Sequence, residues 1–339
     1  MPSSSDAQSK SPGTPPPPAT TTTTTPTTTM TTTAETQAQS QSQTPQPATD
    51  VKPTTAEGTI TTQYSFPSHR LRRRQHQCDK TPLVLVACGS FSPITYLHLR
   101  MFEMASDYVR FSTEYEVVGG YLSPVSDAYK KAGLAPADHR VTMCGLAAEE
   151  TSEWLMVDPW EATQAQYMPT AKVLDHFEHE INTVIGGVEV ADGDGDDDDG
   201  PRTRRPVRIA LLAGADLIQT MSTPGVWDSN DLDHILGRFG VFIIERAGTD
   251  IEEAIDHLRR WESNIYVIEQ VVQNDVSSTK IRLFLKRDMS VRYLIPEPVI
   301  QYIESNNLYK DDDPGAKAAN RNPDKGKGLS GEAFFNRAG

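Results

Sequence analysis

The stretch that decides the fold is "LVLVAC" (83–88), which runs directly into "GSFSPITYLH" (89–98). The first six residues are an apolar run of the length typical of a buried strand. A glycine, two serines and a proline then break the chain before an apolar, helix-like stretch opens at His98. A buried strand that passes through such a turn into a helix is the first part of a βαβ unit.

The same alternation of strand and helix continues along the chain. Short apolar runs predict further strands over 115–122, 153–158, 207–214, 240–246 and 264–269. Helical spacing and capping residues predict helices over 97–110, 137–150, 170–185, 250–262, 277–287 and 296–308. This order predicts an α/β domain built around a doubly wound, mainly parallel sheet.

The two ends of the chain have a different composition. Residues 1–78 are rich in Thr, Pro, Ser and Gln, and residues 311–339 are polar. Such segments have too little apolar surface to offset the entropy of ordering. We therefore expect a disordered N-terminal tail, a flexible C-terminal tail and one domain over 79–310. A chain that starts near Lys80 should then keep full activity and stability.

Charge is unevenly distributed along the sequence. The net charge of −14 argues against binding to nucleic acid. Part of it lies in the acidic run "DGDGDDDDG" (192–200), which predicts a mobile insertion over 188–206. Two basic segments, "HRLRRRQH" (69–76) and "RTRR" (202–205), are either nuclear import signals or solvated linkers.

Cysteine usage and hydropathy limit the class of protein. The three cysteines, with no CxxC pair, suggest neither a disulfide framework nor a zinc site. No apolar run near the N-terminus has the pattern of a signal peptide, and none approaches the ~20 residues that span a bilayer. We expect a soluble, intracellular protein with no nucleic-acid or membrane partner.

In a doubly wound sheet the ligand binds beyond the carboxyl ends of the strands, where the winding reverses. After the first strand, Gly89 lets the backbone approach a ligand closely, and the N–H groups of the turn can face a phosphate. His98, at the start of the next helix, can donate a hydrogen bond to a phosphate oxygen in a transition state. The alternative is an ordinary turn in which His98 caps the helix.

Other strand ends supply further candidates. Lys131, in a double lysine after the second strand, can reach an anionic ligand or lie in solvent. Asp216 follows Gly214 at the end of the fourth strand, and it can accept from a ribose or a base amine or cap the next helix. Tyr167 and Trp227 are loop aromatics that fit a flat ligand, with core packing as the alternative.

The chain after the sixth strand, "NDVSSTKIR", opens a helix with hydroxyl groups. Ser277, Ser278 and Thr279 stand at its start, and Arg282 follows one turn later. Hydroxyls, free N–H groups, the positive helix end and a guanidinium can converge on one anion. Two phosphate sites fit a nucleotide, although neither a Walker A motif nor GxGxxG is present.

The pairing of "GSFSPITYLH" with "SSTKIR" resembles the nucleotidyltransferase α/β-phosphodiesterase superfamily. The blocks "HLRMFEMA", "SPVSDAYKKAGL", "HRVTMC", "VDPWE" and "LLAGADLI" narrow the resemblance to eukaryotic, fungal-like nicotinamide/nicotinate mononucleotide adenylyltransferases. The resemblance covers residues 82–309. Thr95 stands where the superfamily has its first histidine, Leu97 replaces a glycine, and Tyr167 replaces a frequent Trp.

The resemblance implies a Rossmann-like nucleotidyltransferase fold and a reaction in NAD biosynthesis. ATP would transfer its adenylyl group to nicotinamide mononucleotide or nicotinate mononucleotide, giving NAD or deamido-NAD and pyrophosphate. The mononucleotide phosphate would attack the α-phosphate directly and in line, so no protein nucleophile is needed. Mg²⁺ would bind through the substrate phosphates, without a metal site on the protein. The family also implies a homo-oligomer in the nucleus and cytoplasm.

The resemblance also assigns site residues. His98 and Arg282 would be catalytic. The ATP-binding residues would be Gly89, Ser90, His98, Gly214, Asp216, Arg246, Asn274, Ser277, Ser278, Thr279 and Arg282. The mononucleotide-binding residues would be Ser90, Phe91, Lys131, Tyr167, Thr170, Val226 and Trp227.

Two other functions remain open at this point. A pantetheine-phosphate adenylyltransferase or a cytidylyltransferase of the same superfamily would not need Tyr167 and Trp227. A catalytically silent nucleotide-binding module could act through its tails as a scaffold or chaperone. The presence of His98, Ser278 and Arg282 speaks against the silent module.

Overall fold

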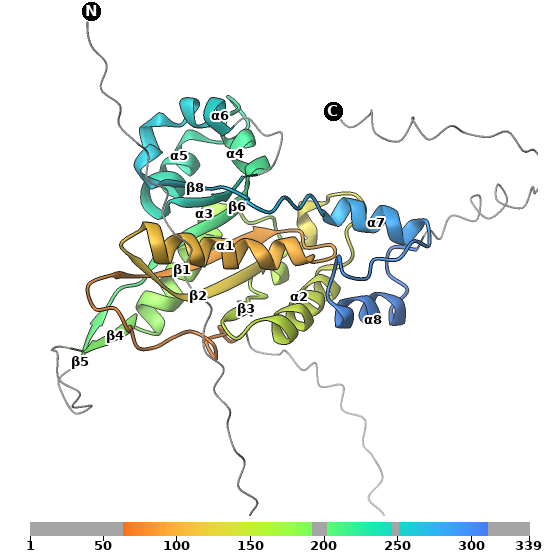
Figure 1. Cartoon of the computed structure of the whole chain (residues 1–339), viewed down its shortest axis with the longest axis horizontal. Coiled ribbons are helices and arrows are strands. Elements are labelled where there is room, and N and C mark those ends of the chain that lie inside the picture. The colour runs from red at the N-terminus through yellow and green to blue at the C-terminus, as the bar shows by residue number, and fades with distance from the viewer. Residues whose placement is uncertain (1–63, 192–201, 246–250, 311–339) are drawn as a thin grey trace, which may run out of the picture. The chain divides into compact units, whose positions relative to one another are not determined.

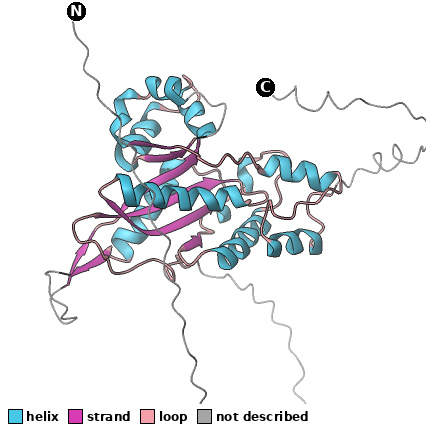
Figure 2. Cartoon of the chain, in the orientation of Figure 1, coloured by secondary structure: helices cyan, strands magenta, loops and turns pink. Residues whose placement is uncertain are grey.

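The computed structural model describes residues 64–191, 202–245 and 251–310 (Figure 1). The predicted C-terminal tail, most of the predicted N-terminal tail and the acidic run 192–200 lie outside the described residues. The described residues form a six-stranded sheet with helices packed on both of its faces (Figures 1 and 2). No helix among them is long and apolar enough to cross a membrane.

All six strands of this sheet are parallel. In chain order they are β1 (Thr81–Gly89), β2 (Tyr115–Pro124), β3 (Leu155–Val157), β6 (Arg208–Gly214), β7 (Val241–Ile244) and β8 (Ile265–Ile268). Their order across the sheet is β3-β2-β1-β6-β7-β8, so the winding reverses between β1 and β6. The predicted doubly wound sheet is confirmed, strand by strand.

The helices follow the predicted order with two additions. The described α-helices are α1 (Tyr96–Ser112), α2 (Ala137–Thr151), α3 (Thr170–Glu178), α4 (Ala215–Ser222), α5 (Ser229–Leu232), α6 (Ile251–His257), α7 (Ser278–Lys286) and α8 (Glu297–Ser305). Shorter 3₁₀ and π segments cover Asp127–Tyr129, Glu161–Thr163, His179–Val184, Asp233–Phe239 and Arg259–Asn264. α4 and α5 are the two helices that residue spacing did not predict.

Side chains of β1 alternate between two hydrophobic clusters, one on each face of the sheet. Leu83 and Leu85 belong to the cluster that α1, α2, α7 and α8 cover, whereas Val84 and Val86 belong to the cluster that α3, α4 and α6 cover. All four side chains are fully buried. A parallel strand covered on both faces appears in the sequence as a continuous apolar run, and this is why "LVLV" identifies the centre of the sheet.

The predicted mobile insertion begins and ends in regular structure. β4 (Val188–Ala191) and β5 (Arg202–Arg205) pair as antiparallel strands, and the two valines of β4 are buried. The guanidinium of Arg204 contacts the carboxylate of Glu189 at 3.1 Å. The structure therefore has regular strands at both ends of the predicted insertion, which composition did not show because the acidic run dominated it and the polar sequence of β5 has no strand pattern.

Residues 64–78, which we call the strap, fold onto the domain and are not part of a disordered tail. Leu71 is 5% exposed and joins the hydrophobic cluster on the α3 face. The backbone N–H of Arg72 donates to the carbonyl of Val118 in β2 at 2.9 Å, and its guanidinium contacts the buried Glu116 at 2.8 Å. The domain start predicted at residue 79 is wrong. The mean composition of residues 1–78 is polar, and it gave no indication that residues 64–78 are folded.

Candidate active site

A cavity of about 760 Å³ opens at the carboxyl ends of β1 and β6. Cys88 and Gly89 from β1 and Ala213 and Gly214 from β6 line its floor, and Ile244 at the end of β7 joins them. This is the point where the winding of the sheet reverses, so the cavity lies where the topology places a ligand.

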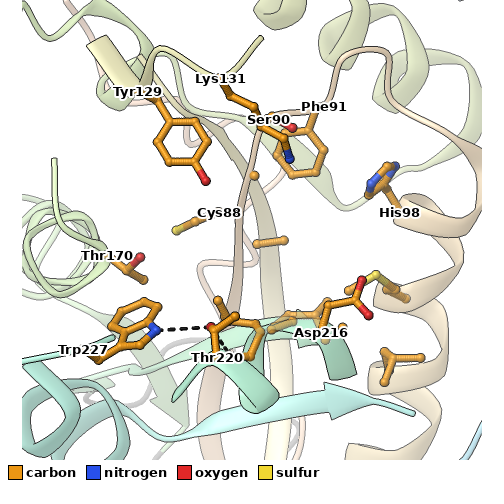
Figure 3. Close-up of a pocket in the computed structure, with 18 of the residues that line it drawn as sticks. Cys88, Ser90, Phe91, His98, Tyr129, Lys131, Thr170, Asp216, Thr220 and Trp227 are labelled. Carbon is orange, nitrogen blue, oxygen red and sulfur yellow. Dashed lines mark hydrogen bonds between the residues drawn. The ribbon is translucent and has the colours of Figure 1, made fainter. Parts of the chain in front are cut away.

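The structure brings together most of the residues predicted for the site (Figure 3). The predicted residues that line the cavity are Gly89, Ser90, Phe91, His98, Lys131, Tyr167, Thr170, Gly214, Asp216, Val226 and Trp227. In the view of Figure 3, Tyr129 and Trp227 lie on one side of the cavity and His98 lies on the other. The cavity therefore has an aromatic end and a separate end at the start of α1.

The turn after β1 folds a phenylalanine back over the end of the strand. Phe91 adopts a φ of 40° and is 4% exposed. A Cβ atom at Gly89 would lie 2.9 Å from the Phe91 ring, so this position needs glycine to make room for the ring. The ring also packs edge-on against His98, with centroids 5.2 Å apart. The glycine thus serves the shape of the turn as well as the approach of a ligand.

His98 caps α1 and lines the cavity at the same time. The backbone N–H of Thr95 donates to Nδ1 of His98 at 3.0 Å, and Oγ1 of Thr95 lies 2.8 Å from the same nitrogen. This is a capping box in which His replaces the usual Glu or Gln. Because Nδ1 accepts a hydrogen bond, a neutral His98 ring carries its proton on Nε2.

A buried arginine shapes the turn from behind. The side chain of Arg140, in α2, is fully buried. It donates to the carbonyls of Ser90, Val125 and Ala135 at 3.1, 2.7 and 2.8 Å, and it contacts Asp127 at 3.1 Å. Four acceptors from three segments satisfy the guanidinium and hold those segments together. The sequence block "HRVTMC" contains this residue, but nothing in its spacing showed that the arginine points inward.

The charged groups of the cavity wall are few. Among the described residues that line it, Lys131 is the only Lys or Arg, and the carboxylates are Asp216, Asp228 and Asp231. Lys130, the other member of the double lysine, takes a φ of 52° at the end of a 3₁₀ turn and does not line the cavity. One lysine, and not a diffuse basic surface, therefore offers positive charge to an anionic ligand here.

The aromatic end of the cavity contains a residue that the sequence analysis missed. Tyr129 stacks against Tyr167, with ring centroids 5.7 Å apart and planes at 26°. The indole N–H of Trp227 donates to Oγ1 of Thr220 at 3.2 Å, which fixes the ring at the cavity wall. Tyr129 lies two residues before Lys131, in the same loop after the second strand, so its position in the sequence could have indicated a residue of the site.

The residues at the start of α7 do not line the cavity. Oγ of Ser278 donates to the carbonyl of Pro93 at 2.8 Å, and Nη1 of Arg282 donates to the carbonyl of Ser92 at 2.8 Å. Ser277 caps α7, and Oγ1 of Thr279 accepts from Nη2 of Arg282 at 3.3 Å. The expected convergence of these groups on one anion is therefore replaced by contacts that tie α7 to the turn after β1.

Two further ATP-site predictions are not placed in the cavity either. Asn274 uses its side-chain oxygen to accept from the N–H of Val276 at 3.0 Å and does not line the cavity. Arg246 lies outside the described residues.

Cys88 in the floor of the cavity lies near a buried ionisable group, Glu161. Oγ of Ser123 donates to Oε2 of Glu161 at 2.6 Å, and burial raises the pKa of Glu161 to about 7. Burial, and then the charge of Glu161, raises the pKa of the Cys88 thiol well above its ordinary value. Cys88 is thus a neutral thiol and a poor nucleophile.

Comparisons with known proteins agree with this geometry. Residues 86–284 match the family model described as cytidylyltransferase-like. The nicotinamide/nicotinic acid mononucleotide adenylyltransferase of Schizosaccharomyces pombe is 56% identical over 255 residues, which are 74% of this chain and 67% of that protein. Adenylyltransferase 2 of this name from Saccharomyces cerevisiae is 55% identical over 73% of this chain, and adenylyltransferase 1 from Bos taurus is 40% identical over 69%. The match spans 61% and 91% of those two relatives.

The parallel sheet and the cavity at its switch point define an enzyme of the nucleotidyltransferase class. Within that class, the chain belongs to the nicotinamide/nicotinic acid mononucleotide adenylyltransferase family. The resemblance inferred from the sequence motifs is confirmed. The relatives carry the names of adenylyltransferases, which are enzymes, and not of catalytically silent modules.

Proposed function

We propose that this protein transfers the adenylyl group of ATP to nicotinamide mononucleotide, and also to nicotinate mononucleotide. The products are pyrophosphate and NAD or deamido-NAD. The observation that carries this proposal is that one cavity combines the turn after β1 and His98 with an aromatic end formed by Tyr129, Tyr167 and Trp227. A pyridine nucleotide has one phosphate and one flat ring, so it matches both ends.

The chemistry needs no nucleophile from the protein. A phosphate oxygen of the mononucleotide forms a bond to the α-phosphorus of ATP as the bond to the pyrophosphate oxygen breaks. The enzyme holds the two reactants in line and stabilises the negative charge on the α-phosphate. We assign this stabilisation to the Nε2–H of His98, because the cap at Nδ1 fixes both the ring and its tautomer.

Each substrate has a separate part of the cavity. Lys131 lies among the lining residues as the positive group for the mononucleotide phosphate, and Trp227 and Tyr167 flank the pyridine ring. The positively charged nicotinamide ring gains a cation–π contribution from such aromatics. Gly214, at the end of β6, and Asp216, in the first turn of α4, both line the cavity, and we assign them to the ribose of ATP.

Arg282 positions the turn after β1, and it also has hydrogen-bond donors left for the phosphates of ATP. It positions the turn after β1 through the carbonyl of Ser92. A guanidinium has five N–H donors, so the turn and Thr279 leave donors for the β- and γ-phosphates of ATP. Arg282 does not line the cavity in this structure, and we infer that its remaining donors neutralise the leaving pyrophosphate.

Mg²⁺ fits this site as an ion held by the phosphates of ATP. The cavity wall supplies separate carboxylates at Asp216, Asp228 and Asp231. The part of the chain that the structure describes has no group of three or more His, Cys, Asp or Glu side chains that could hold a metal by itself. When bound, Mg²⁺ would supply charge neutralisation on the phosphates, and Asp216, a carboxylate of the cavity wall, would contribute a ligand.

One assay tests the proposal directly. Purified protein with ATP and Mg²⁺ is supplied with nicotinamide mononucleotide, nicotinate mononucleotide or 4′-phosphopantetheine, and pyrophosphate release is measured with each acceptor. CTP replaces ATP in a matched series. We expect release with ATP and the two pyridine mononucleotides. Release with phosphopantetheine, or a preference for CTP, would assign the protein to another transferase of the superfamily.

A further inference from the structure

The strap begins against the residue that follows β3 and against α3, whose first residue, Thr170, lines the cavity. The hydroxyl of Tyr64 donates to Oδ1 of Asp158 at 3.0 Å and lies 3.0 Å from Nε2 of His176. Two residues later, Phe66 packs on Tyr121 in β2, with ring centroids 5.2 Å apart. These contacts fix the first residues of the strap against β2 and against the residue that follows β3.

Asp158 is the centre of this arrangement. It is 1% exposed and comes directly after β3. Three donors meet its carboxylate: the hydroxyl of Tyr64, Nε2 of His176 at 2.9 Å and the backbone N–H of Trp160 at 3.1 Å. A buried carboxylate is stable only when hydrogen bonds replace its water. The orientation of Asp158 therefore depends on the strap as well as on its own loop.

The same contacts fix both ends of the segment 158–170. Asp158 stands at its start. His176 lies in α3, and α3 begins with Thr170 in the cavity wall. The His176 ring also stacks on Trp160, with centroids 4.1 Å apart and planes at 5°. The hydroxyl of Tyr64 contacts both Asp158 and His176, so it connects the start of the segment to the helix that follows its end.

The middle of the segment carries an aromatic ring into the cavity. Oγ1 of Thr163 and Nε2 of Gln164 both donate to the carbonyl of Trp160 at 2.9 Å, which makes the segment a connected unit. Tyr167 then reaches the cavity and stacks on Tyr129. A shift of the Trp160 turn at the base therefore moves Tyr167 at the other end.

We propose that Tyr64 is a positioning residue for the mononucleotide subsite, and that the strap braces the 158–170 segment through it. The hydroxyl holds Asp158 and His176 so that Tyr167 and Thr170 meet the pyridine nucleotide. The identity of that ligand rests on the proposed function.

The proton on the Tyr64 hydroxyl is securely held. Burial, and then the charge of Asp158, raise the pKa of Tyr64 far above its ordinary value, so the hydroxyl stays a donor. The ATP side of the cavity, at Gly214 and Asp216, is built from β6 and α4 instead. Loss of the brace should therefore act on one substrate and not on the other.

The test compares two tyrosine-to-phenylalanine variants. Tyr64→Phe removes the brace, and Tyr115→Phe removes a hydroxyl that meets Tyr266 at 3.1 Å at the amino end of β2, away from the cavity. Titration calorimetry and steady-state kinetics are run with nicotinamide mononucleotide and with ATP. One lost hydrogen bond predicts a rise of about three- to ten-fold in the mononucleotide Kd and KM for Tyr64→Phe only. ATP binding should stay at the wild-type value in both variants.

The outcomes separate the brace from a general effect on stability. Equal rises for both substrates, or equal behaviour of the two variants, would overturn the proposal. Asp158→Asn keeps the size of the side chain and disturbs the His176 contact, so it should give the same selective rise. A selective rise in Asp158→Asn without one in Tyr64→Phe would also exclude the strap as the brace. A wild-type protein that binds ATP and no pyridine mononucleotide would overturn the proposed function, and this proposal with it.

Discussion

At the scale of single residues, His98 uses its two ring nitrogens for two tasks. Nδ1 accepts the backbone N–H of Thr95 and completes the cap of α1, which leaves the proton of the neutral ring on Nε2. The sequence offered the cap and the phosphate donor as alternatives, whereas the cap is present and the ring lines the cavity as well. A variant that keeps one task and removes the other can therefore separate them.

His98→Gln and His98→Ala form such a pair. Gln can complete the capping box, but it does not present an imidazole N–H to the α-phosphate. We expect kcat to fall about 10²–10³-fold in both variants, with a smaller change in KM, because the lost hydrogen bond acts mainly in the transition state. Only His98→Ala should also lose about 1 kcal/mol of stability. Full activity in His98→Gln, measured at saturating substrates, would show that the cap is the whole contribution of His98.

Glu161 makes the stability of the protein depend on pH. The side chain is 3% exposed, and its pKa rises from 4.5 to about 7 because of burial, against the lowering effects of Ser123 and Arg140. Between these two values the folded protein retains a proton that the unfolded chain has released. The free energy of unfolding contributed by this group therefore falls as pH rises through the window, and the loss is complete above about pH 7.

Glu161→Gln should remove this dependence. A neutral amide can accept from Ser123 as the protonated acid does, so the variant should match the wild type near pH 4. Above pH 7 the variant should be more stable than the wild type by about 2–4 kcal/mol, because no buried charge has to form. Thermal unfolding of both proteins across this range measures the difference. A difference that does not change with pH would show that Glu161 titrates at its ordinary value.

At the scale of elements, the sequence predicts the strands that helices bury on both faces of the sheet. It misses the elements that are held by contacts with residues far away in the chain. "LVLV" in β1 is apolar on both faces because both faces are covered. α4 follows β6 without a loop and has eight residues, too few for a clear helical period. β5 is the polar sequence "RTRR", and its partners are the backbone of β4 and the Glu189 carboxylate. No local pattern marks such a strand.

The strap is the largest element that the composition hid. Its buried side chains include Leu71 and Gln75, which are too few to give an apolar period. Long-range contacts hold it instead. Nη1 of Arg70 donates to the carbonyl of Leu155 at 2.9 Å, and the carboxylate of Glu116 accepts from the guanidinium of Arg72 and from two backbone N–H groups of the strap. A segment held mainly by single hydrogen bonds to other elements cannot be recognised from its own residues.

Removing the strap should therefore destabilise the domain. A chain that begins at Lys80 loses Leu71 from the core and leaves the buried Glu116 without three of its donors. We expect a loss of about 3 kcal/mol or more, which lowers Tm by about 6–12 °C in a domain of this size. A chain that begins at Thr61 keeps every described contact and should match the full-length protein. Equal Tm values for the two shortened chains would show that the strap adds no stability.

At the scale of the whole molecule, the topology predicted from the sequence was enough to locate the cavity. It was not enough to predict which side chains point into the cavity. The switch point between β1 and β6 follows from the order of strands and helices, and the cavity lies there. The sequence shows which residues follow a strand, but it does not show which way their side chains turn. Ser278 and Arg282 turn toward the carbonyls of Pro93 and Ser92, and Tyr129 turns into the cavity.

The same topology separates the two strands that flank the acidic run, β4 and β5, from the site. Arg205, at the end of β5, donates to the carbonyl of Cys78, three residues before β1, and β6 begins three residues after Arg205. The β4–β5 hairpin therefore lies at the amino ends of β1 and β6, whereas the cavity lies at their carboxyl ends. The seven residues of β6 extend over about 20 Å, more than twice the Debye length of about 8 Å at physiological ionic strength.

Replacing the Asp residues of 192–200 with Ser should consequently leave catalysis unchanged. The described residues that flank this run are anchored at the far end of the sheet, and salt screens charge over that distance. We expect the Mg²⁺ concentration for half-maximal NAD formation, and both KM values, to stay at the wild-type level. Asp216→Asn is the matched control, because it removes one carboxylate from the cavity wall and should raise the Mg²⁺ requirement. A comparable rise in the Ser-substituted protein, at constant ionic strength, would mean that the acidic run reaches the substrate phosphates.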